Sequence, residues 1–220
     1  MKDRSPVFDA NAAGGNSLGP LPEWNLDDLY TGEKAAQLQR DMDWLETACA
    51  DFAASYEGKM AGLDAAGLLE AVKRYEAIDV AAGRVMSFAG LRYYQETTNA
   101  SRAKFMSDCQ DKITTFTTPL VFWSLEFNRL DDAHLEALYA ANADLARYRP
   151  VMDRMRAMKP YQLSDELEKF MHDQSTVGAS AWNKLFDETL AGLEFDLEGE
   201  KVIRTHDSCD VGLVGEQFAG

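Results

Sequence analysis

Histidine and carboxylate side chains at helical spacing are the first candidates for chemistry in this sequence of 220 residues. His172 follows Glu168 by four residues and Asp165 by seven, so one face of a helix would present all three. One interpretation is a partial metal site or a carboxylate-tuned histidine. The other is a solvated helix face with an ordinary i,i+4 pair. We favour the solvated face, because two ligands without a further partner rarely hold zinc.

The remaining histidines offer weaker patterns. His134 lies two residues before Glu136 near the start of a short predicted helix, where a surface or packing role is the ordinary interpretation. The run His206, Asp207 and Cys209 resembles a nucleophile group, but sequence neighbours do not generally converge on one atom. An unpatterned tail also does not preorganise them. We favour no site at either place.

Compact catalytic signatures are absent from the sequence. No HExxH, Walker loop, GxSxG, GxGxxG or CxxC pattern occurs. Each of these patterns has a fixed spacing that is hard to disguise. The sequence therefore predicts no catalytic residue, no cofactor-binding residue and no metal ligand in this chain.

A series of aromatic residues is the other candidate for a binding function. Phe116, Phe122, Trp123 and Phe127 share a helical spacing. Such a series can line a peptide-binding groove, or it can belong to the core. We favour the core, because aromatic residues at this spacing more often pack inside a protein.

Long helices must position these side chains. Between Glu33 and Glu57 the apolar residues recur with a 4-3-4-3-4 spacing, which predicts the seam of an antiparallel or coiled-coil helix. These residues are Leu38, Met42, Leu45, Cys49, Phe52 and Tyr56. Gly58 is the expected stop, since glycine enters the left-handed conformation without steric cost.

Capping and breaking residues predict the limits of the later helices. The expected N-caps are Asp64, Asn99, Asp131 and Ser164. Pro119 predicts a kink or break, because proline lacks the backbone donor. The small residues at 81–83 and 89–90 are expected to allow close approach of a neighbouring helix. Of the adjacent Tyr93 and Tyr94, one ring should pack while the other faces a cleft or solvent.

The last predicted helix lies in the stretch Val177 to Leu190 and ends at Gly192. Its large apolar residues are expected to form a packing stripe that seats a β-hairpin against the bundle, with Gly178, Ala179 and Ala181 allowing close contact. The stripe consists of Trp182, Leu185, Phe186 and Leu190.

Beyond Gly192 the apolar period changes from helical to alternating. Leu193, Phe195 and Leu197 alternate with acids, and a turn at 198–199 leads to a strand containing Val202. The predicted fold class is therefore mainly α, with long antiparallel helical hairpins and shorter helices in a bundle and a small β-hairpin near the C-terminus.

The expected organisation has four parts. Residues 1–19 read as a flexible leader and residues 20–190 as a helical domain. Residues 191–203 form the predicted β-hairpin, and the tail 204–220 shows neither period clearly.

Charge narrows the choice of partners. There are 37 Asp and Glu residues against 22 Lys and Arg residues, giving a formal net charge of -15. This balance repels phosphate backbones and anionic lipid surfaces. We therefore expect neither a nucleic acid nor a membrane as partner.

Cysteine usage and the N-terminal residues indicate the compartment. Cys49, Cys109 and Cys209 are odd in number and far apart, which fits buried thiols in a reducing cytosol better than a disulfide framework. The N-terminal segment lacks the apolar region of a secretory signal. The expected location is cytoplasmic.

Three segments carry a resemblance to a known family. They are W-x-L-x-D-L-Y at Trp24 to Tyr30, L-S-x-E-x-E at Leu163 to Glu168, and G-A-x-A-W-x-x-L-F-D-E at Gly178 to Glu188. Over roughly residues 20–202 the chain resembles the N-terminal region of oligoendopeptidase F, within the thimet-oligopeptidase-like zinc peptidases.

The resemblance implies a function for the whole enzyme rather than for this chain. In that family the N-terminal helices form one wall of a deep channel, and a C-terminal catalytic domain supplies zinc through HExxH and a further glutamate. The full-length enzyme would hydrolyse short peptides in the cytosol. None of those zinc ligands maps onto this sequence, so the resemblance implies an inactive chain whose partners are short peptides, reached through the full-length enzyme, and the missing catalytic domain.

The segment after Val202 departs from the family pattern, because members usually continue from the hairpin into a further helix. A truncated or frameshifted reading frame, or an expression fragment, is our hypothesis for this departure and for the missing HExxH. An alternative function is a free-standing helical module that binds a peptide or a partner protein without enzymatic activity. We favour the non-catalytic N-terminal portion, and we expect self-association through its uncovered apolar faces.

Overall fold

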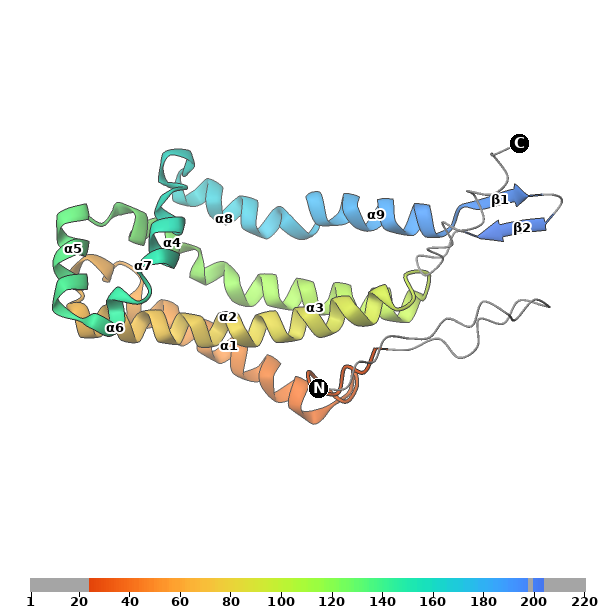
Figure 1. Ribbon diagram of the computed structural model, residues 1–220, viewed down its shortest axis with the longest axis horizontal. Helices are drawn as coiled ribbons and strands as arrows, with labels where there is room; N and C mark the ends of the chain where they lie inside the picture. The colour runs from red at the N-terminus through yellow and green to blue at the C-terminus, as the bar shows by residue number, and fades with distance from the viewer. Residues whose placement is uncertain (1–23, 198–199, 204–220) are drawn as a thin grey trace, which may run out of the picture.

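The computed structural model describes residues 24–197 and 200–203. The leader expected at 1–19 and the tail expected at 204–220 lie outside these described residues, as do His206, Asp207 and Cys209. Within the described ranges the chain folds into a helical bundle with a long helical arm lying along it (Figure 1).

The first helical hairpin pairs α1 (Ala36–Tyr56) with α2 (Ala65–Tyr94), and a 3-10 turn, η1 (Met60–Gly62), connects them. The six seam residues predicted for α1 are all buried, which confirms the 4-3-4-3-4 pattern. Gly58 has φ 75, so the predicted left-handed stop is also confirmed. The carboxylate of Asp64 accepts from the Gly67 amide over 2.7 Å and caps α2.

The third long helix, α3 (Ala100–Thr117), packs on α2 and on α1. The Asn99 side chain caps it by accepting from the Ser101 and Arg102 amides. Pro119 breaks the helix as predicted: the chain passes through η2 (Thr118–Val121) before α4 (Phe122–Arg129) begins.

Short helices close one end of the bundle. They are α5 (Asp132–Ala141), α6 (Ala143–Ala146) and α7 (Arg149–Arg156), followed by η3 (Lys159–Tyr161). The predicted cap at Asp131 accepts from the His134 amide over 3.0 Å. Arg156 holds this end together, because its guanidinium donates to the Phe127 and Leu130 carbonyls, over 2.8 Å and 3.0 Å.

Aromatic residues fill the centre of the core. Trp123 stacks on Tyr75 with ring centroids 5.2 Å apart and meets Phe52 edge-on at 5.5 Å. Phe122 and Phe127 are also buried, and Phe116 packs against the same cluster. The core interpretation of this aromatic series is therefore confirmed.

The final helices form the arm, defined here as residues 163–193. It contains α8 (Asp165–Asp173), η4 (Gln174–Thr176) and α9 (Ala179–Ala191). In Figure 1 α8 and α9 run one after the other beside α3. Contacts of α8 with η2 and α3, and of η4 with α3, join the arm to the bundle.

The predicted fold class, a mainly α bundle with a small β-hairpin near the C-terminus, is right for the helical bundle but wrong in giving the β-hairpin a place in the fold. Two short strands, β1 (Glu194–Leu197) and β2 (Glu200–Ile203), pair with each other in antiparallel register after the arm, and the turn predicted at 198–199 lies outside the described residues. No helix of the described part packs extensively on either strand. The two strands with the alternating pattern pair with each other. They therefore form no sheet that packs on the helical core.

None of the helices in residues 24–197 combines the length and the apolar character that a membrane crossing requires.

Candidate functional site

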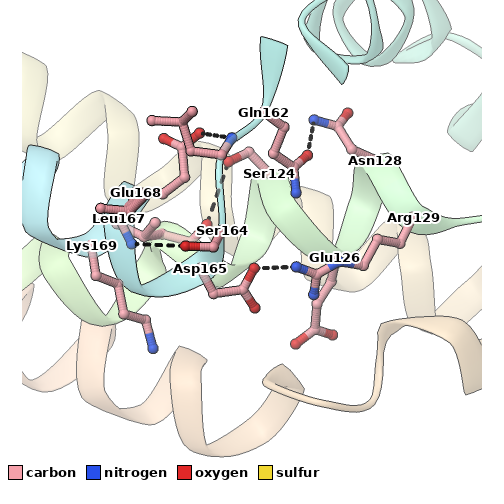
Figure 2. A network of polar contacts seen from close by, with 12 residues as sticks. Ser124, Glu126, Asn128, Arg129, Gln162, Ser164, Asp165, Leu167, Glu168 and Lys169 are labelled. Atoms are coloured by element: carbon pink, nitrogen blue, oxygen red, sulfur yellow. Dashed lines mark hydrogen bonds and ion pairs between the residues drawn. The ribbon is translucent and has the colours of Figure 1, made fainter. Parts of the chain in front are cut away.

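The start of the arm is fixed by its own side chains and by the bundle. The Leu167 amide donates to the Ser164 hydroxyl over 3.4 Å, and the Leu163 amide donates to the Glu168 carboxylate over 2.9 Å (Figure 2). This reciprocal arrangement satisfies amide groups that the first turn leaves free. The predicted N-cap at Ser164 is confirmed.

Residues of α4 hold this helix start against the bundle. The Asn128 amide group donates to the Gln162 side-chain oxygen over 2.9 Å, and Arg129 forms an ion pair with Asp165 (Figure 2). The hydrogen bond that Arg129 donates to Asp165 raises the pKa of the guanidinium above its usual value.

Polar contacts continue along α8. The Thr117 hydroxyl lies 3.1 Å from His172 Nε2, and the Thr118 hydroxyl donates to the Asp173 carboxylate over 2.5 Å. Lys169 pairs with Glu57 at 3.3 Å. The arm is thus attached to the bundle chiefly by hydrogen bonds and ion pairs.

Of the three residues first considered as a metal site, two serve this attachment and one supports the start of its own helix. Asp165 pairs with Arg129, Glu168 caps its own helix, and His172 contacts Thr117. Within residues 24–197 and 200–203 no group of three or more histidine, cysteine, aspartate or glutamate side chains is arranged to hold a metal ion.

The other candidate groups are also separated. Glu136 pairs with Arg149 rather than with His134, whose Nε2 atom is buried without a hydrogen-bond partner in the described structure. Cys49 and Cys109 are buried free thiols, and burial raises the pKa of each to about 11. Such thiols are poor nucleophiles near neutral pH.

The arm turns its apolar side away from the bundle. Trp182 is 70% exposed and Phe186 is 62% exposed, so the expectation that they form a packing stripe under a hairpin is wrong. The exposed apolar side chains on this side of the arm, here called the outer face, are Leu163, Leu167, Phe170, Val177, Trp182, Phe186 and Leu193. Met171 and Leu185 are also exposed, but they border spaces between the arm and the bundle.

The opposite side of the arm faces the bundle and is mostly polar. Its half-buried polar residues, here called the inner face, are Asp165, Glu168, Lys169, His172, Thr176, Ser180, Lys184 and Asp187. Near the end of α9 the half-buried Leu190 and the buried Ala191 add an apolar contact. α8 and α9 are both amphipathic, as the sequence predicts. In an ordinary surface helix the apolar side faces the core, whereas here the polar side faces the bundle and the apolar side faces solvent. The apolar side therefore has no partner within the described chain.

Two hollows lie between the inner face and the bundle. One, of about 410 Å³, is bordered by α8 and the Tyr75 and Asp79 side of α2. The other, of about 460 Å³, lies between α9, α3 and the end of α2 and is here called the α9 hollow. Asp187 and Glu188, the last two residues of the family-like motif at Gly178 to Glu188, line the α9 hollow together with Asp111.

Sequence reasoning did not assign these carboxylates a role. Their positions in the helical period show that they share a side of α9 with other polar residues, but not that this side faces the bundle. Tyr93 and Tyr94 also line the α9 hollow, and their predicted division is confirmed, since Tyr93 is buried and Tyr94 is exposed.

This helical architecture is shared with a solved peptidase. The chain is similar in structure to oligoendopeptidase-F from Enterococcus faecium, with a TM-score of 0.60 and 16% sequence identity over 77% of this chain. The matched part covers 32% of that protein, so the chain spans about a third of its length. The likeness defines the class of the fold, which is a bundle of helices.

A sequence comparison points to the same family. Residues 126–195 match the family model for the N-terminal part of M3 peptidases described as Oligopeptidase F. The resemblance seen in the sequence is thereby confirmed: this part of the chain is similar to the N-terminal region of the oligopeptidase F family. No curated protein sequence matches this chain.

Proposed function

We propose that this chain is the non-catalytic N-terminal portion of a zinc metalloendopeptidase similar to oligoendopeptidase F, and that it forms one wall of a channel for short peptides in the cytosol. The family match over residues 126–195 and the shared fold support this proposal. The catalytic portion of the enzyme would be its principal partner.

The outer face of the arm is the observation that carries the proposal. It places three large side chains, Phe170, Trp182 and Phe186, in water within the segment that matches the family model. Contiguous exposed apolar side chains mark surfaces that bind another protein or domain. A catalytic portion laid against this face would bury them and leave the inner face and its hollows toward the bundle.

The residues of this chain do not fit the zinc site of the family. The sequence holds three histidines and no HExxH pattern, and the described part contains no cluster of metal-ligating side chains. Zinc in the proposed enzyme would therefore be held by the other portion. The DNA that encodes the chain and its flanks, read past Val202 in all frames, should contain an HExxH sequence.

Reconstitution tests the proposal. The purified chain by itself should bind no stoichiometric zinc and should not cleave a quenched fluorescent peptide. Mixed with a separately purified catalytic portion of an oligoendopeptidase F-like enzyme, it should form a complex on size-exclusion chromatography and raise peptide hydrolysis. Chelator-sensitive turnover by the chain alone would contradict the proposal.

A matched pair of tryptophan variants locates the contact. Trp182→Ser removes an exposed ring from the outer face, and Trp44→Ser removes an exposed ring from α1. We expect only Trp182→Ser to weaken the complex, by about tenfold or more, because buried tryptophans dominate the binding energy of interfaces. Equal effects of the two variants, or no complex at all, would favour the free-standing binding module instead.

A further inference from the structure

The α9 hollow combines carboxylates with apolar side chains. Asp111 of α3 and Asp187 and Glu188 of α9 border it, and so do the side chains of Met86 and Met106. Lys184 is the cationic side chain among the described residues that line it, and its ammonium lies 3.9 Å from Glu188. The lining therefore keeps an excess of negative charge beside flexible apolar groups.

Tyr93 gives this hollow a second, independent feature. The residue is 1% exposed and lines the hollow, yet its hydroxyl has no hydrogen-bond partner in the described structure. It also lies outside the main core cluster. A buried hydroxyl without a partner is unfavourable, so native structures usually pair such groups with protein, water or a ligand.

The charges of α9 act directly on this hydroxyl. Burial raises the pKa of Tyr93 to about 12, and the charges of Glu188 and Asp187 add to the effect. The phenol therefore stays neutral at physiological pH, and its oxygen has lone pairs free to accept a hydrogen bond. Tyr93 of α2 and the two carboxylates of α9 thus bring hydrogen-bond acceptors from two helices to the lining of one hollow.

We propose that the α9 hollow binds the primary ammonium group of a peptide. An ammonium group carries three donors, which the Tyr93 hydroxyl and the Asp187 and Glu188 carboxylates can accept. The aliphatic carbons next to the ammonium would contact Met86 and Met106. This inference rests on the proposed function, since it gives the channel wall a preference among peptides.

The chemistry of the lining separates this ligand from others. An anionic ligand would meet the repulsion of Asp111, Asp187 and Glu188. A divalent metal ion would need a convergent set of ligands, and the described residues contain no such cluster. A peptide ammonium requires only hydrogen-bond acceptors and a negative potential.

Peptide titrations test the inference without a catalytic partner. The probe is a short peptide with a free N-terminus and one lysine, titrated into the purified chain by calorimetry at physiological ionic strength. N-acetylation and replacement of the lysine by norleucine, singly and together, distinguish the two sources of the ammonium group. We expect one of the single changes to weaken binding about tenfold, and the double change to do at least as much.

Matched variants assign the binding to this hollow. Tyr93→Phe removes its unpartnered hydroxyl, whereas Tyr139→Phe removes another buried hydroxyl without a partner that lies outside the lining. Asp187→Asn removes a lining charge, whereas Glu166→Gln removes an exposed charge on α8. We expect Tyr93→Phe and Asp187→Asn to weaken binding about threefold to tenfold and the two controls to leave it unchanged, with circular dichroism showing that all variants fold.

Several results would overturn the inference. They are equal binding of the doubly blocked peptide, equal effects of Tyr93→Phe and Tyr139→Phe, and no peptide binding by the purified chain. These outcomes are separate from the reconstitution experiment, because a chain that fails to bind peptide can still form the complex. Conversely, loss of the complex with ammonium binding intact would reject the proposed function alone.

Discussion

The Asn128 amide group of α4 donates a hydrogen bond to the Gln162 side-chain oxygen over 2.9 Å, where the chain approaches the arm. Asn128 is 4% exposed and is one of the few buried polar residues in the described structure. The bond therefore satisfies a donor that water does not reach, and it ties the residue just before the arm to α4.

Gln162→Ala should loosen the start of the arm. The variant leaves the Asn128 amide buried without this partner, at a cost of about 1–3 kcal/mol. Hydrogen exchange should rise across α8 while the buried amides of α1 and α2 keep their protection. Gln39→Ala is the control, because Gln39 bonds only the exposed side chain of Asp43. Equal exchange in both variants would contradict this role of Gln162.

Two glycine substitutions should change stability in opposite directions. A Cβ at Gly178 would lie 2.9 Å from the Gln174 carbonyl oxygen, so Gly178→Ala should cost about 1–3 kcal/mol through the strain it forces at the start of α9. A Cβ at Gly83, inside α2, would meet no atom within 4 Å, so Gly83→Ala should stabilise by about 0.5–1 kcal/mol. Urea denaturation measures both, and a stable Gly178→Ala variant would contradict the prediction.

The outer face should drive self-association. Replacing both Trp182 and Phe186 by serine removes exposed apolar area at little cost to folding, since surface changes usually stay within about 0.5 kcal/mol. Sedimentation velocity should show a shift toward monomer. Val80→Ser, which removes an exposed apolar residue of α2, is the control and should leave association unchanged. Undiminished association in the double variant would exclude this face.

Stability should fall in mildly alkaline solution. Burial raises the pKa of Cys49 and Cys109 to about 11 from 9.0, so between these values the unfolded chain loses protons that the folded chain keeps. The free energy of unfolding is then fully maintained below about pH 9 and decreases as the pH rises toward 11. Denaturation under reducing conditions from about pH 8 to about pH 10 measures the slope.

The contribution of one thiol can be isolated. Cys49→Ala and Leu45→Ala both leave a cavity in the same buried seam, and both should lower stability at about pH 8. Only Cys49→Ala removes a titrating group, so only this variant should show a flatter dependence on pH. A slope unchanged in Cys49→Ala would contradict the assignment.

Local sequence signals predicted the bundle well. Apolar spacing placed Leu45 and Phe52 in the core, and Asp64 and Asn99 cap helices where predicted. Pro119 lies in η2, the 3-10 turn that separates α3 from α4. These features depend on residues close together in the chain, so a short stretch of sequence is enough to predict them. Among the small residues of α2, Ala82 and Ala89 pack with the core as expected, whereas a Cβ at Gly83 would meet no atom within 4 Å.

The arm shows what local patterns do not contain. The period around Trp182 predicts an amphipathic helix, but the direction of its apolar side depends on the partners available. Here the bundle offers Thr117 and Thr118 to α8, and the polar side docks on them. The unpartnered Tyr93 hydroxyl was invisible for a similar reason, since burial and hydrogen bonding depend on residues distant in sequence.

The order of the contacts in the bundle has a consequence for how fast it forms. The helices that pack on each other most extensively, α1 with α2 and α2 with α3, are also neighbours in sequence. A short connection joins the two helices of each pair. Bringing them together therefore costs little loop-closure entropy before their apolar contacts stabilise the pair. Rapid folding of the bundle is expected, with the polar docking of the arm as a later and separable step.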